Sequence, residues 1–83
     1  MKSKIKRSLL LILLAADGVP MPESAALEAA RIHARPLTPT DADVLDALRD
    51  LETDGYAAGV TDDIEGRTWA LTTKGTHKAR QLR

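Results

Sequence analysis

Apolar residues recur at helical spacing in the stretch 37–56, LTPTDADVLDALRDLETDGY, and both ends of the pattern carry helix-boundary residues. Thr38 is the expected N-cap, because its hydroxyl can accept a backbone N–H that the first turn leaves unpaired, and Pro39 suits the first helical position. Gly55 is the expected left-handed residue that ends the helix. The apolar positions that define the buried face are Val44, Leu45, Leu48 and Leu51. We therefore predict one helix here, with an acidic solvent face.

The N-terminal stretch KSKIKRSLLLILLAA, residues 2–16, predicts a first helix that is apolar around much of its circumference. A basic segment before a short apolar run also resembles a secretory signal, but Leu14 stands where the cleavage pattern needs a small residue. The run is too short to span a membrane, so no membrane partner is expected. We expect the helix to end at Asp17 and Gly18.

Two helices and a hairpin complete the predicted order. After the stiff connector 19–22, a helix begins near Pro22, runs to Arg35 and has a thin apolar stripe. Strands at 56–60 and 67–71 flank an acidic loop and predict a β-hairpin. Thr72 is the expected N-cap of a last helix, about residues 73–82, whose first turn Gly75 should weaken. The stripe of the second helix is formed by Ala26, Leu27 and Ala30.

The composition fits one small domain that spans residues 1–83. The chain has no Phe, one Trp and one Tyr, so the core must be built mainly from aliphatic residues. It has no Cys, which excludes a disulfide framework and a thiolate metal site and fits a reducing compartment such as the cytoplasm.

Charge is segregated along a chain whose formal net charge is zero. Residues 41–66 hold nine acidic residues and one base, Arg49, whereas residues 67–83 hold five bases and no acid. The N-terminus adds four positive residues before the first acid: Lys2, Lys4, Lys6 and Arg7. An acidic middle therefore lies between two basic ends, which we interpret as solvated faces or as arms for nucleic acid.

The spacing of residues along the sequence gives little support for a catalytic site or a metal site. His33 and His77 stand alone on different predicted helices, without the ligand spacing of a zinc site. The acidic loop of Asp62, Asp63 and Glu65 lacks the twelve-residue ligand spacing of a calcium loop and is expected to be a solvated tip. No Ser/His/Asp arrangement and no Gly-rich phosphate loop is present. We expect no enzyme activity, no metal and no cofactor.

Two segments resemble the winged helix-turn-helix family in the style of the MarR and PadR regulators. LRDLETDGY, residues 48–56, is similar to the end of that family's recognition helix, and WALTTKG, residues 69–75, is similar to its passage from the wing into the next helix. The chain is also similar to small winged-helix proteins of Mu-like prophages. The resemblance implies an α+β fold with a three-helix core, a two-stranded β-hairpin wing and a C-terminal helix.

The resemblance also implies a DNA-binding, non-enzymatic transcriptional regulator. In the family, the start of the third helix and the turn before it face the major groove, and a wing arginine reaches the backbone or minor groove. The DNA-binding residues expected by position are Arg35, Thr38, Thr40, Asp43, Arg49 and Arg67, together with the basic arm of Lys2, Lys4 and Lys6.

The acidic third helix and wing suggest an alternative, because carboxylates repel DNA phosphates. In that interpretation the chain is a protein-interaction module that docks on a basic protein partner or mimics DNA.

The first helix also suggests self-association. Residues 9–14 are apolar without interruption, and large exposed apolar patches are rare on soluble monomers. We therefore predict a homodimer formed by the first and last helices. The interface residues that we expect are Leu10, Leu11, Leu14, Ala79 and Leu82. If the chain is monomeric, the first helix must instead be a central helix wrapped by its own chain.

Overall fold

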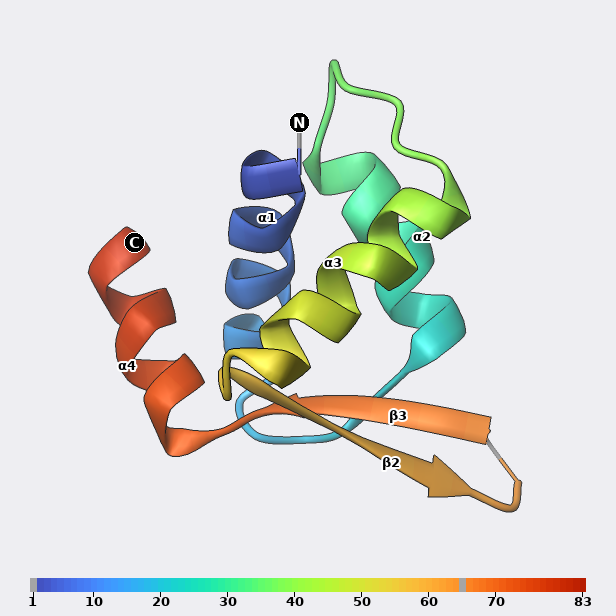
Figure 1. Cartoon of the computed structure of the whole chain (residues 1–83), viewed down its shortest axis with the longest axis vertical. Coiled ribbons are helices and arrows are strands. Elements are labelled where there is room, and N and C mark those ends of the chain that lie inside the picture. The colour runs from blue at the N-terminus through green and yellow to red at the C-terminus, as the bar shows by residue number, and fades with distance from the viewer. Residues whose placement is uncertain (1, 65) are drawn as a thin grey trace.

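The computed structural model describes residues 2–64 and 66–83. It contains helices α1 (Lys2–Ala15), α2 (Glu23–His33), α3 (Asp41–Thr53) and α4 (Thr73–Leu82), and strands β1 (Met21–Pro22), β2 (Ala57–Asp62) and β3 (Gly66–Leu71). In Figure 1, α1 stands between α4 on one side and α2 and α3 on the other, and the β2–β3 hairpin extends away below them. The predicted α+β winged helix, with its three-helix core, hairpin wing and C-terminal helix, is confirmed.

The sheet has three antiparallel strands in the order β1-β3-β2, where the sequence predicted two. The residues predicted to form a stiff connector supply the third strand, with Met21 opposite Trp69 and Pro22 opposite Thr68. A two-residue strand is too short to show a period of two, and a proline is tolerated because β1 lies at the sheet edge. The wing strands also extend further toward their tip than predicted, and the described turn residues between them are 63 and 64.

The core surrounds α1 and a single indole. Trp69 is only 1% exposed, and the other buried side chains are mainly aliphatic, as the composition predicted. The α1 residues Ile5, Leu9, Leu10, Ile12 and Leu13 are buried against the other elements of the same chain. The core is completed by Ala30, Val44, Ala47, Leu48, Leu51, Ala57 and Ala79. The first helix is therefore the central helix of the domain.

The predicted start of the third helix is wrong by two residues. The N-cap of α3 is Thr40: its hydroxyl accepts from the Asp43 backbone N–H at 3.2 Å, and the Asp43 carboxylate accepts from the Thr40 N–H at 3.0 Å. This reciprocal pair is a capping box, with Asp in place of the usual Glu. Thr38 lies in the preceding turn with its side chain exposed, and Pro39 is buried.

The end of α3 matches the prediction. Gly55 has φ +81°, its N–H donates to the Glu52 carbonyl at 3.0 Å, and the Tyr56 N–H donates to the Leu51 carbonyl at 2.8 Å. These two bonds form the Schellman motif that ends many helices. The chain is thereby directed from α3 into the wing.

Thr72 caps α4 as predicted, because its hydroxyl accepts from the Gly75 N–H at 3.0 Å. Gly75 has a role that its low helix propensity did not indicate: a Cβ at this position would collide with the Tyr56 carbonyl oxygen. The glycine lets α4 approach the backbone that follows α3.

The predicted bounds of the second helix need a small correction, since Pro22 is the N-cap residue of α2 and the helix ends at His33.

Candidate functional site

A hollow of about 490 Å³ lies between α3, the wing strand β3 and the start of α2. We call it the helix–wing groove. Its lining residues are Glu23, Leu45, Arg49, Glu52, Thr53, Arg67 and Trp69. In this groove α3 lies beside the wing. The winged-helix resemblance assigns these two elements to DNA binding.

Arg67 is anchored across the floor of this groove. Its Nη2 lies 3.1 Å from Glu52 Oε2, and its guanidinium carbon lies 4.8 Å from the centre of the Trp69 ring. Glu52 Oε2 also accepts from the Gly59 backbone N–H at 3.3 Å. A Cβ at Gly59 would fall 2.7 Å from Arg67 Nε, so a side chain there would force the guanidinium to move. One carboxylate of α3 thus holds both strands of the wing.

A second glutamate holds the opposite wall of the groove. The Trp69 indole Nε1–H donates to Glu23 Oε1 at 3.1 Å, which fixes the first residue of α2 to β3. The remaining cation of the groove is Arg49, on the exposed side of α3. Arg49 has no ion pair among residues 2–64 and 66–83, so its guanidinium is available to a ligand.

Every acidic residue from position 41 to position 54 has a partner. Asp43 caps its own helix, and five others pair with cations from elsewhere in the fold. The cation pairs are Lys2 with Asp46 and Asp50, Lys6 with Asp54, Arg31 with Asp41, and Arg67 with Glu52. With Arg49 included, five positive charges offset six negative ones over this surface. The acidity that the local sequence suggested is therefore largely compensated.

Lys2 makes the shortest of these contacts. Its Nζ lies 2.6 Å from Asp50 Oδ2 and 2.9 Å from Asp46 Oδ2. The hydrogen bonds to Asp50 and then Asp46 raise the pKa of Lys2 above its ordinary value of 10.5. The hydrogen bond from Lys2 lowers the pKa of Asp50 below its ordinary value of 3.8, against a smaller opposing effect of desolvation. The N-terminus of α1 is thus tied to the outer face of α3.

The predicted DNA-binding residues are divided among four places. Arg49 and Arg67 meet in the helix–wing groove, whereas Lys2 and Lys6 pair with carboxylates of α3 and the residue after it. Thr40 and Asp43 form the cap of α3, and Thr38 precedes it. Lys4 and Arg35 line a separate hollow between α1 and the end of α2.

The sequence prediction missed Glu23 and Glu52, the two carboxylates that hold the groove. A signal for Glu52 was present, since it stands three residues after Arg49 and therefore near it on the same helix face. Glu23 carried no such signal, because its partner Trp69 is 46 residues away in the sequence.

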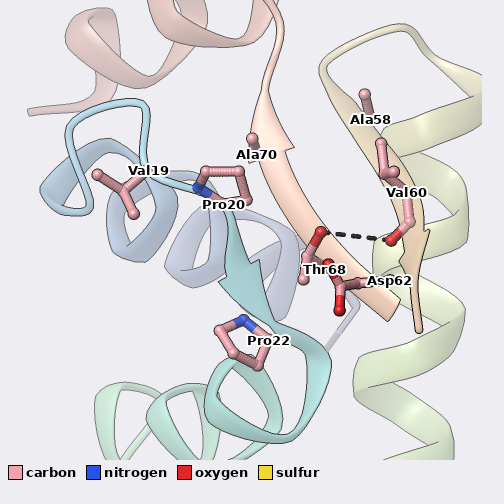
Figure 2. Close-up of a pocket in the computed structure, with 8 residues that line it drawn as sticks. All are labelled: Val19, Pro20, Pro22, Ala58, Val60, Asp62, Thr68 and Ala70. Carbon is pink, nitrogen blue, oxygen red and sulfur yellow. Dashed lines mark hydrogen bonds between the residues drawn. The ribbon is translucent and has the colours of Figure 1, made fainter. Parts of the chain in front are cut away.

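A mainly apolar hollow lies along the sheet, beside the chain that leads into β1 (Figure 2). Val19 and the two prolines lie on one side of β3, and Ala58 and Val60 lie on the other. Thr68 is fixed between them by a hydrogen bond from its hydroxyl to the Val60 carbonyl, at 3.3 Å. The polar side chains of this hollow are those of Thr68 and Asp62, and its other lining residues are apolar.

The residues predicted for a dimer interface differ in exposure. Leu10 and Ala79 are buried in the core of their own chain, with 4% and 0% of their surface exposed. Leu11, Leu14 and Leu82 are half-buried and line three different hollows.

Glu65, which the sequence placed in the acidic wing tip, lies outside the described residues. Within the described part of the chain, no three His, Asp or Glu side chains gather as a metal ion would require. No helix in residues 2–64 and 66–83 is both long enough and apolar enough to cross a membrane.

Comparison with known proteins supports the fold. No protein-family model matches the sequence, and no curated protein matches it. Among solved structures, the chain is similar to the crystal structure of a MarR-family transcriptional regulator from Silicibacter pomeroyi, with a TM-score of 0.70 and 26% sequence identity. The likeness covers 95% of this chain and 48% of that protein, so the chain spans about half the length of the regulator.

Proposed function

We propose that this winged-helix domain binds duplex DNA through the helix–wing groove and acts as a transcriptional regulator. The observation that carries the proposal is the meeting of Arg49 and Arg67 in a groove between α3 and the wing. Support comes from the likeness to the solved structure of a MarR-family transcriptional regulator. The domain would place α3 toward the major groove and the wing toward the adjacent backbone.

The two arginines have different tasks in this proposal. Arg49 forms no ion pair among the described residues and would contact a phosphate or a base edge directly. Arg67 would exchange Glu52 for a phosphate. In the Arg67–Glu52 ion pair, each side chain is about two-fifths exposed, and such pairs contribute at most about 1 kcal/mol to stability. A DNA phosphate can therefore displace the carboxylate without a large loss.

The compensated surface of α3 makes the alternative, a mimic of DNA that docks on a basic protein, less favourable. A mimic needs carboxylates that are free to meet cations of the partner. In this fold five of the carboxylates in residues 41–54 already form ion pairs with Lys2, Lys6, Arg31 and Arg67. Docking on a basic protein would exchange these pairs for others of the same kind, so the acidity of α3 by itself offers little gain in binding.

Fluorescence anisotropy with a labelled duplex at about 50 mM salt tests DNA binding, since phosphate contacts are strongest at low salt. Arg49→Gln and Arg67→Gln should each weaken binding, and two lost contacts should reduce the salt slope, d(log K)/d(log salt), by about 2 in magnitude. Arg80→Gln is the matched control, because Arg80 is an exposed arginine on α4 outside the groove. Absence of binding by the unmodified chain, or an equal loss in the Arg80 variant, contradicts the proposal.

We also propose that the groove serves binding and not catalysis.

The homodimer that the sequence predicts would have to use Leu11, Leu14 and Leu82, since Leu10 and Ala79 offer little surface. Light scattering at high micromolar concentration tests this: a particle of twice 9.0 kDa that Leu14→Glu dissociates would support pairing. A 9.0 kDa particle would leave α1 as a helix covered by its own chain alone.

A further inference from the structure

A hollow with an unusual concentration of positive charge lies between α1 and the end of α2. We call it the basic hollow; its volume is about 290 Å³. Its lining residues are Lys4, Arg7, Ser8, Leu11, His33, Ala34 and Arg35. No Asp or Glu lines it among the described residues.

The α1 side of the basic hollow is one face of a helix, because positions 4, 7, 8 and 11 follow helical spacing. A contact with α4 also holds Arg7: its Nη2 donates to the Leu82 carbonyl at the end of α4, at 3.2 Å. A guanidinium has five N–H donors, so Arg7 keeps donors for a ligand while this bond holds its position.

Three basic side chains of this hollow have no ion-pair partner among the described residues. Lys2, Lys6, Arg31 and Arg67 are paired with carboxylates, whereas Lys4, Arg7 and Arg35 form no ion pair among residues 2–64 and 66–83. These three side chains line one small concavity, and Arg7 also lines the neighbouring hollow between α1 and α4, where its guanidinium meets the Leu82 carbonyl. The end of α2 adds a negative partial charge of about half an electron, and the start of α1 adds a positive one of the same size, so these two effects offset each other.

We propose that the basic hollow binds a phosphate group. Arginine presents forked donors that match a tetrahedral oxyanion, and lysine adds a point charge. A phosphate would also relieve the mutual repulsion of Lys4, Arg7 and Arg35. The basic hollow shares no lining residue with the helix–wing groove, so the proposal does not rest on the proposed function. The phosphate can be a phosphodiester of duplex DNA or a free phosphate ester.

The first test uses inorganic phosphate and the full chain. Amide signals of ¹⁵N-labelled protein are followed during a phosphate titration, with potassium chloride keeping the ionic strength constant. Saturable shifts confined to residues 4–11 and 33–37 are expected. Lys4→Gln and Arg35→Gln should each weaken binding about fivefold, close to 1 kcal/mol, while Arg80→Gln leaves it unchanged. Both replaced side chains are exposed, so the variants should stay folded, which circular dichroism checks.

Shifts that do not saturate, or that persist unchanged in the folded Lys4→Gln/Arg35→Gln double variant, overturn the proposal. A second experiment then identifies the source of the phosphate by measuring duplex DNA affinity of the same double variant. A reduced affinity and a salt slope smaller by about 2 assign the hollow to a DNA phosphodiester. Unchanged DNA affinity, together with lost binding of inorganic phosphate, assigns it to a free phosphate ester.

Discussion

Glu52 of α3 and Arg67 of the wing form an ion pair, with Oε2 and Nη2 separated by 3.1 Å. The same carboxylate oxygen accepts from the backbone of Gly59, so it joins the recognition-position helix to both wing strands. The pair thus sets the position of the wing and occupies the arginine that the proposed function assigns to DNA. Since an exposed pair of this kind is weak, it can hold the wing in the free protein and open when a phosphate arrives.

Replacing Glu52 by Gln should strengthen DNA binding. The variant keeps the shape of the side chain and an acceptor for Gly59, but it removes a negative charge from the groove and releases Arg67. We expect a gain in affinity of about fivefold at low salt, close to 1 kcal/mol. Anisotropy measures it, and Glu28→Gln, an exposed carboxylate of α2 outside the groove, is the control. Unchanged or weaker binding by the Glu52 variant would show that the pair does not restrain Arg67.

The two threonines before α3 should differ in their effect on stability. Thr40→Ala removes the cap and should lower the free energy of unfolding by about 1 kcal/mol. Thr38→Ala should change it by less than about 0.5 kcal/mol, because Thr38 is exposed and precedes the cap. Urea denaturation followed by circular dichroism compares them. An equal loss in both variants would place part of the cap at Thr38.

Gly75→Ala should destabilise the domain, although alanine is the better helix former by about 1 kcal/mol. The added methyl group would collide with the Tyr56 carbonyl oxygen and push α4 from the chain that follows α3. Overpacking of this kind lowers the free energy of unfolding by about 1–3 kcal/mol. Lys78→Ala, an exposed change in the same helix, should be nearly neutral. A stabilised Gly75 variant in the same urea series would mean that α4 can shift freely.

The Lys2–Asp50 contact should appear in a pH titration. A lowered pKa at Asp50 means that its contribution to stability is present above the ordinary value of 3.8 and is lost as the pH falls through the folded pKa. The raised pKa of Lys2 has the opposite sign: its contribution is full below 10.5 and is lost as the pH rises through the folded pKa. Carboxyl-carbon NMR should show the pKa of Asp50 rising toward its ordinary value in Lys2→Gln and unchanged in Lys4→Gln. No response to the Lys2 variant would exclude a persistent contact.

Short-range chemistry explains what the sequence determined by itself. The apolar faces of α1 and α3, the αL residue Gly55 and the cap Thr72 each depend on residues within a few positions of one another. Their spacing therefore predicts the helices, the hairpin and the order of a winged helix. Arg49 and Arg67 are predicted from the position that each takes in the winged-helix resemblance, and their role in DNA binding stays a prediction.

Only the tertiary structure decided which of two local choices is realised. Thr38 and Thr40 are both acceptable caps, and in the fold Thr40 forms the reciprocal pair with Asp43 while Pro39 is buried ahead of the helix start at Asp41. Strand β1 exists because β3 lies beside it, since two residues have no periodicity of their own. Gly75 weakens a helix in isolation but is needed once Tyr56 packs against it.

The charge of the candidate site shows most clearly what the sequence determined and what the tertiary structure decided. Along the sequence, residues 41–54 are strongly acidic, and that pattern alone favours repulsion of DNA. In the fold, Lys2 reaches Asp50, and Lys6 reaches Asp54 across 48 positions of sequence. Electrostatic interaction depends on distance in space and not on separation along the chain. The sequence by itself therefore determined which charges the protein carries, and only the tertiary structure decided which of them neutralise one another and which, in the groove and the basic hollow, remain available to a ligand.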